Sequence, residues 1–132
     1  MTKILVIEDE ESVRENIVEL LDTEGFEALA AKNGRIGLCL AQEELPDLIL
    51  CDVRMPELDG YGVLTGLRSE PTTAAIPFIF LTAKAAKTDL SLGLELGANA
   101  YITKPFTLVE VLDTIERTLL HTPAQAAPIQ SR

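Results

Sequence analysis

Apolar and polar residues along this chain form blocks whose period changes repeatedly between that of a strand and that of a helix. Short, continuous apolar runs predict five strands, at 3–7, 26–31, 48–51, 76–81 and 100–103. Each run precedes a segment with apolar residues at helical spacing, which predicts helices at 12–24, 34–45, 61–69, 87–96 and 108–120. In the segment 87–96 four leucines alternate as they would in a strand, so we do not expect all of them to be buried on one helical face.

Repeated strand-then-helix units predict one α/β domain with a parallel sheet, because right-handed crossovers place helices on both faces of the sheet. The expected architecture is a doubly wound, flavodoxin-like (βα)5 fold with the strand order 2-1-3-4-5. Sheets of this kind bind their ligands at the carboxyl ends of the strands. The polar residues that follow strands one, three, four and five are Glu8, Asp9, Asp52, Thr82 and Lys104. We therefore expect them to share one edge of the sheet.

The central strand carries the acid on which the functional interpretation depends. Its apolar run at 48–51 does not alternate, which is typical of a strand covered on both faces, and it leads directly into Asp52. Pro56 cannot continue the sheet, and Asp59-Gly60 offers a turn and an N-cap for the next helix. Asp52 is therefore expected at an open edge of the sheet.

Charge and composition exclude several classes of partner. The chain has 132 residues, a formal net charge of -10 and a pI near 4.5. Unaided binding to DNA, RNA or an anionic membrane is not expected, because phosphate contacts need Lys and Arg. With no leader pattern and no apolar segment of membrane-spanning length, we expect a cytoplasmic protein. Cys39 and Cys51 are predicted to be buried thiols without a chemical role.

Three carboxylates at one edge of a sheet repel one another, and a hard divalent cation such as Mg²⁺ (or Mn²⁺) relieves that repulsion. Beside such a cation Asp52 is a candidate nucleophile toward phosphorus. Lys104 is expected to bind one phosphoryl oxygen and Thr82 to donate its hydroxyl to another, while the small Ala83 leaves the site open. The bond before Pro105 is a candidate cis peptide, because cis bonds are almost confined to proline.

These residues, in this order and spacing, resemble the receiver domain of bacterial two-component response regulators, the CheY-like superfamily. The similarity extends from residue 3 to about residue 120. It rests on Glu8-Asp9, on Asp52 with Met55-Pro56 and Asp59-Gly60, on Thr82-Ala83, on Gly97-Ala98 with Tyr101, and on Lys104-Pro105-Phe106. Glu8 stands where the family more often has aspartate.

The resemblance implies a signalling switch that takes a phosphoryl group on Asp52 from a histidine kinase or a phosphotransfer protein. The switch would then change its partner-binding face and act on a downstream output domain or protein. Asp9, Asp52 and the Arg54 carbonyl are implied as direct Mg²⁺ ligands, with Glu8 acting through water. The residues implied in phosphoryl binding and switching are Thr82, Ala83, Tyr101 and Lys104. Such a domain is not an enzyme beyond its own phosphorylation and dephosphorylation.

Plainer interpretations exist for each residue and for the whole chain. Acids after a strand are often only first-turn helix residues, and a tyrosine on a strand is by default half-buried. A phosphohydrolase could also use Asp52 with Mg²⁺, but such enzymes commonly have a second acid two residues later, where this chain has Arg54. A dinucleotide-binding module would need a glycine-rich turn after the first strand. A degenerate receiver would serve only as an interaction module, which the intact Asp52, Thr82 and Lys104 disfavour.

Domain boundaries and regulation complete the expectations. Residues 1–121 are predicted to form the receiver domain and 122–132 a flexible tail or linker. Arg54 and Lys84 lie two residues after Asp52 and Thr82, and we expect both to reach toward the site and lengthen the lifetime of the phosphorylated form. An alternative is that these cations stabilise hydrolysis, as an arginine finger does. The face formed by 87–120 is expected to carry the response and is a candidate homodimer contact.

Overall fold

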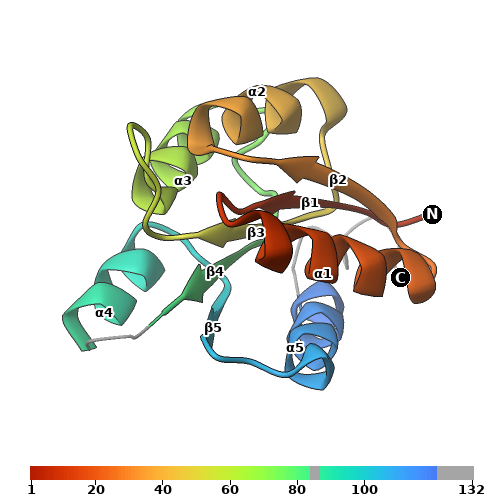
Figure 1. The fold of residues 1–132 in the computed structure, drawn as a ribbon. Helices are drawn as coiled ribbons and strands as arrows, with labels where there is room; N and C mark the ends of the chain where they lie inside the picture. Colours follow the sequence, from red (N-terminus) through yellow and green to blue (C-terminus); the bar gives the residue numbers. More distant parts are fainter. Residues whose placement is uncertain (84–86, 122–132) are drawn as a thin grey trace.

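The computed structural model describes residues 1–83 and 87–121, with the backbone alone for 87–90. Strands and helices alternate along these ranges, as the sequence predicted (Figure 1). The strands are β1 (Lys3–Ile7), β2 (Glu27–Ala31), β3 (Leu48–Asp52), β4 (Phe78–Thr82) and β5 (Ala100–Thr103). The helices are α1 (Glu11–Thr23), α2 (Gly34–Glu44), α3 (Gly60–Ser69), α4 (Lys87–Glu95) and α5 (Leu108–Leu120).

The strands form one parallel sheet in the order β2-β1-β3-β4-β5, which confirms the predicted doubly wound fold. The register pairs Asp52 with Leu81 and Thr82 with Thr103, so β3, β4 and β5 end at nearly the same level. The residues that follow these strands consequently lie along one edge of the sheet. This edge is where the predicted site residues meet.

Two apolar cores lie on opposite faces of the sheet. One is covered by α2 and α3, and the other by α1 and α5 (Figure 1). The strand β3 contributes to both, with Ile49 and Cys51 in the first core and Leu48 and Leu50 in the second, each of them 0% exposed. Because both faces of β3 are covered, its sequence is a continuous apolar run and not an alternating one.

Most of the side chains described for α4, those of residues 91–95, are exposed. Leu92 and Leu94 are 41% and 50% exposed, which confirms that the leucines of this segment are not all buried. Between them Gly93 is buried, and a Cβ at this position would lie 2.9 Å from the ring of Phe80. The absence of a side chain at Gly93 therefore allows the helix to approach the sheet.

The structure corrects three local expectations. The strand β4 begins at Phe78 and not at 76, because Pro77 has no N–H to donate to the sheet. The strand β2 begins at Glu27, one residue later than expected. Cys39 is exposed, so the prediction of a buried thiol was wrong for this residue and right for Cys51. The buried residues of α2 are the small Gly34, Gly37 and Ala41. Cys39 lies on the opposite side of that helix, while Leu38 and Leu40 pack against the core and are only partly buried.

The predicted tail at 122–132 lies outside the described residues. Within the described ranges, no helix combines the length and the apolar composition that crossing a membrane requires.

Candidate functional site

The loop after β3 fixes Asp52 at the edge of the sheet. The backbone N–H of Val53 donates to Leu81 (3.1 Å), and its carbonyl accepts from Gly60 (2.8 Å). A Cβ at Gly60 would overlap the carbonyl oxygen of Asp52, so only glycine fits where the loop turns into α3. Asp59 caps that helix by accepting a hydrogen bond from the N–H of residue 62 (2.9 Å). Asp52 is thereby held in place with only 7% of its surface exposed.

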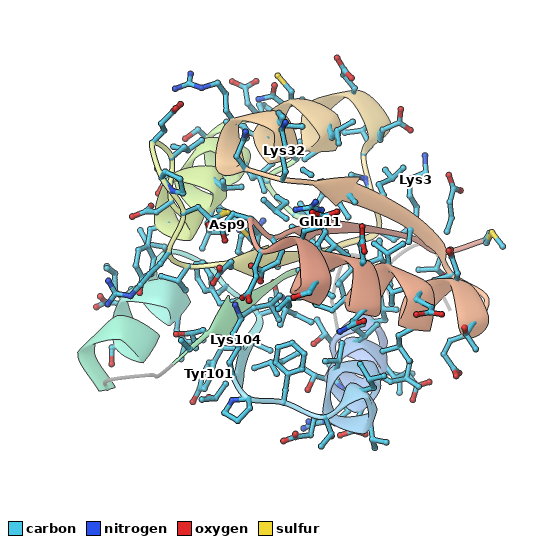
Figure 2. The ribbon with its side chains drawn as sticks, in the orientation of Figure 1. Lys3, Asp9, Glu11, Lys32, Tyr101 and Lys104 are labelled. Carbon is cyan, nitrogen blue, oxygen red and sulfur yellow. The ribbon has the colours of Figure 1, made fainter. Side chains whose placement is uncertain are left out.

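The three predicted acids meet at this edge. One carboxylate oxygen each of Glu8, Asp9 and Asp52 lies within 4.8 Å of the others. Their burial differs, since Glu8 is 0% exposed whereas Asp9 is open to solvent. Figure 2 shows Asp9 and Lys104 at the same end of the sheet and Lys3 at the opposite end. The carboxyl ends of the strands therefore gather the acids and the lysine.

Lys104 reaches both buried acids. Its Nζ lies 3.0 Å from Glu8 Oε1 and 3.5 Å from Asp52 Oδ2. The second oxygen of Glu8 accepts a hydrogen bond from the N–H of Glu10 (3.0 Å). The peptide bond between Lys104 and Pro105 is cis, as predicted. Glu8 thus has partners on both oxygens, while Asp52 shares a longer contact with the lysine.

Burial and mutual repulsion perturb the protonation of this cluster. Burial, reinforced by the charge of Asp52, raises the pKa of Glu8 to about 7, against the lowering effect of its hydrogen bonds. Burial also raises the pKa of Asp52, although Lys104 opposes this shift. Burial would lower the pKa of Lys104, but its bond to Glu8 and the charge of Asp52 outweigh this and raise it. The site therefore holds more negative charge than Lys104 balances.

The donor set of the cluster fits a hard divalent cation. Carboxylate oxygens are the ligands that Mg²⁺ prefers, usually one or two of them together with water and phosphate. Asp9 and Asp52 offer such oxygens beside the buried Glu8, and all three groups approach within 4.8 Å. Positive charge at this point would offset the repulsion that raises the pKa of Glu8 and Asp52. Glu8, Asp9 and Asp52 can hold a metal ion of this class.

The predicted switch residues lie on the β4 side of the site. Thr82, at the end of β4, is 9% exposed and lines a cavity of about 570 Å³ together with Arg54. A second, much smaller space of about 10 Å³ lies between Thr82, Phe80 and Tyr101. Tyr101 on β5 is 40% exposed. Thr82 therefore lines both the cavity at the loop after β3 and the small space that it shares with Tyr101.

The remaining predicted site residues are Ala83, Arg54 and Lys84. Ala83 is exposed directly after β4, and Arg54 is exposed in the loop after β3. Lys84, which was also expected to reach toward the site, lies outside the described residues.

The sequence did not reveal an apolar groove beside the site. A cavity of about 660 Å³ runs between α1 and the segment before α5, and its lining includes Val13, Leu20, Lys104, Phe106 and Leu108. It depends on the adjacency of two helices that are distant along the chain. Val13 and Leu20 fit the helical period of α1, and Phe106 belongs to the Lys104-Pro105-Phe106 motif, so neither pattern alone marks a shared surface.

The comparison with protein families settles the classification of the chain. The family model of the response regulator receiver domain matches residues 4–116. This chain belongs to the response regulator receiver domain family. The predicted family and fold are thereby confirmed.

The receiver domain resembles solved structures over nearly its whole length. Chemotaxis protein CheY4 of Vibrio cholerae superposes with a TM-score of 0.87 at 30% identity, covering 90% of this chain and 99% of that protein. The receiver domain of the Francisella response regulator 1452 gives a TM-score of 0.84 at 29% identity, covering 92% and 99%.

Among curated proteins the receiver domain matches parts of longer ones. It is 41% identical over 126 residues to the alkaline phosphatase synthesis transcriptional regulatory protein PhoP of Bacillus subtilis, covering 96% of this chain and 51% of PhoP. It is 45% identical over 109 residues to the "Probable transcriptional regulator ycf27" of Galdieria sulphuraria, covering 83% and 42%. The chain spans about half the length of these relatives.

Proposed function

We propose that this receiver domain is a phosphoacceptor switch in which Asp52 receives a phosphoryl group from a histidine kinase or a phosphotransfer protein. The observation that carries the proposal is the meeting of Asp52 with Glu8, Asp9 and Lys104 at one edge of the sheet. A buried carboxylate beside a fixed cation and two further acids suits phosphoryl transfer, which needs positioning and charge neutralisation.

In the proposed reaction a carboxylate oxygen of Asp52 attacks phosphorus, the bond from phosphorus to the donor imidazole breaks, and the imidazole leaves after taking up a proton. Lys104 holds one phosphoryl oxygen, and the hydroxyl of Thr82 donates to another. Mg²⁺ (or Mn²⁺), when bound by Asp9, Asp52 and the Arg54 carbonyl and by Glu8 through water, supplies positive charge to the phosphoryl oxygens. The domain then catalyses only its own phosphorylation and dephosphorylation.

The groove along α1 supports a proteinaceous donor. It is lined mainly by apolar side chains, among them Val13, Leu20 and Phe106, and it reaches Lys104 at the edge of the site. An amphipathic helix laid into such a groove would bring its own side chains to the phosphoacceptor. The donor histidine is therefore expected to be presented from a helix that packs against α1.

The conformational response to phosphorylation is proposed to occur on the other side of the site, next to β4 and β5. Inward movement of Thr82 would change the size of the space that it shares with Tyr101. A change in the position of Tyr101 would in turn alter the face made by α4, β5 and α5. Several relatives are named transcriptional regulators, which supports an output domain or protein that binds this face. We place the domain in the cytoplasm. The same face, formed by residues 87–120, is proposed as a homodimer contact.

Intact-mass measurement tests the phosphoacceptor directly. Incubation with acetyl phosphate and Mg²⁺ is expected to add one phosphoryl group to the parent protein and none to Asp52→Asn. Omission of the divalent ion should also prevent labelling. Equal labelling of Asp52→Asn would overturn the assignment of Asp52. Sustained turnover of a small phosphate ester would instead favour the phosphohydrolase, against which the cation at Arg54 already argues.

A further inference from the structure

Arg68, in the last turn of α3, makes an unusual set of contacts at the edge of the sheet away from the site. Its Nη1 donates to the carbonyl of Ile76 (2.8 Å), and its Nη2 donates to the carbonyl of Gly97 (2.8 Å) and to Asn99 Oδ1 (3.3 Å). The side chain is half-buried, and this burial lowers its pKa. Among the described residues no carboxylate forms an ion pair with it. A partly desolvated charge is thus satisfied by neutral oxygens.

These oxygens come from segments that are far apart along the chain. Ile76 precedes β4, Gly97 follows α4, and Asn99 precedes β5. Asn99 also binds Phe78 at the start of β4, with its backbone N–H donating to the Phe78 carbonyl (2.8 Å) and its Oδ1 accepting from the Phe78 N–H (2.9 Å). The Arg68 guanidinium and the Asn99 amide therefore join the beginnings of two neighbouring strands to the end of α4.

Gly97 is required at this junction for two reasons. Its φ of +106° lies in a region that side chains disfavour, and a Cβ here would lie 2.9 Å from Arg68 Nε. Its carbonyl lies just beyond the end of α4, where helices carry partial negative charge that a cation stabilises. The segment Gly97-Ala98-Asn99 thus presents a carbonyl oxygen and an amide oxygen to the same guanidinium nitrogen, Nη2 of Arg68.

The rest of the described part of α4 contrasts with this end. Of the residues Ser91–Glu95 only Gly93 is buried, and Leu92 and Leu94 project into solvent. In this described part of α4, Gly93 approaches Phe80 closely, and hydrogen bonds from the charged Arg68 side chain lie just past the last residue of the helix.

We propose that Arg68 is a clamp that fixes the C-terminal end of α4 and the start of β5. Any movement of α4 then pivots about Gly97. Tyr101 lies two residues after Asn99, and the clamp consequently sets the position of that part of β5. If Tyr101 reports phosphorylation, a step that rests on the proposed function, Arg68 is a positioning residue for the readout. It has no part in the chemistry at Asp52.

Native-state amide hydrogen exchange tests the clamp without any phosphodonor, so its outcome is independent of whether Asp52 is phosphorylated. Four amides report on this junction: Leu96, Gly97, Ala98 and Asn99 donate to Leu92, Leu94, Gly93 and Phe78 respectively. In Arg68→Gln their protection factors should fall roughly tenfold or more, because hydrogen bonds from a charged donor are lost. Amides of β1 and β3 should keep their protection within about twofold. Unchanged protection at the four amides, or an equal fall throughout the domain, would overturn the clamp.

Two further variants sharpen the test. Arg117→Gln removes a cation of the same kind from an exposed pair with Asp113 on α5, and it should leave the four amides unaffected. Asn99→Asp keeps the acceptor oxygen that binds Arg68 and Phe78 and adds a negative charge beside the guanidinium. This variant should raise protection at Gly97 and Ala98 severalfold, and it should do so only while Arg68 is present. A rise that persists in the double variant Arg68→Gln/Asn99→Asp would contradict the proposal.

Discussion

The ammonium of Lys104 lies 3.0 Å from Glu8, closer than the 3.5 Å that separates it from Asp52. The lysine is therefore held mainly by an acid that is itself 0% exposed. This arrangement leaves Asp52 the less strongly paired of the two buried carboxylates, which suits a group that must react. It also makes Glu8 a source of instability, because its charge is buried.

Glu8→Gln should stabilise the metal-free domain above pH 7. Burial raises the pKa of Glu8 to about 7, so the folded state binds a proton more tightly than the unfolded state does. The stability that this proton contributes is complete below the ordinary glutamate pKa of about 4.3 and is lost as the pH rises through about 7. An uncharged glutamine avoids the loss, with a gain of up to about 3 kcal/mol at pH 8 and little gain at pH 4.

Urea unfolding in EDTA at pH 4, 6 and 8 measures this dependence. The exposed Glu15 provides the control, since Glu15→Gln changes the same charge without burial. A destabilised Glu8→Gln at pH 8 would mean that the contact with Lys104 outweighs the cost of burial.

Mg²⁺ should raise the melting temperature of the parent domain, and this effect should be reduced in Asp9→Asn. The cation binds the folded acid cluster and not the dispersed acids of the unfolded chain, so stability grows with its concentration, by about 1.4 kcal/mol at ten times Kd. Asp59→Asn is a matched control, because Asp59 caps α3 outside the cluster and asparagine caps equally well. Equal Mg²⁺ responses of Asp9→Asn and the parent would contradict the assignment of Asp9.

The fold and the site residues were predictable because each depends on local sequence. Glu8, Asp52, Thr82 and Lys104 each follow an apolar run, and parallel topology alone brings such positions to one edge. The outward position of Cys39 was not predictable from apolar content, because the fully buried residues of α2 are the small Gly34, Gly37 and Ala41. The apolar groove and the Arg68 clamp required the three-dimensional structure, since their parts are joined only by packing between distant segments.

Leu45→Gly should be more stable than Leu45→Ala by about 1 kcal/mol. Leu45 ends α2 with φ of 48° and ψ of 62°, a left-handed conformation that costs a side-chain-bearing residue about 1–2 kcal/mol and glycine little. Both variants remove the same half-exposed side chain, so their difference isolates the backbone. Chemical unfolding of the two variants gives the difference directly, and a more stable alanine variant would argue against left-handed strain at this residue.

Addition of beryllofluoride, an analogue of the phosphoryl group, should change chemical shifts chiefly between Thr82 and Val111. The reason is the space of about 10 Å³ that Thr82 shares with Tyr101, through which a movement at the site reaches β5. Tyr101→Phe keeps the ring and should preserve the pattern, whereas Thr82→Ala should weaken it. A response confined to α1 and α2 would refute this route.

The last prediction concerns the lifetime of the phosphorylated form. Arg54 is exposed and lines the cavity of about 570 Å³ beside Thr82, so its side chain is free to reach over a phosphoryl group on Asp52. Hydrolysis needs a water in line with the bond from phosphorus to Asp52, and a long cationic side chain can occupy that approach. Lys84 is expected to act in the same way from the other side, although it lies outside the described residues. Arg54→Asn and Lys84→Ala together should therefore shorten the lifetime severalfold, with Arg35→Asn, a change on the exposed surface of α2, as the control. Decay is followed by intact mass in excess Mg²⁺ after removal of the donor. Slower decay of the double variant would instead show that the two cations stabilise the transition state of hydrolysis, and unchanged decay would reject shielding.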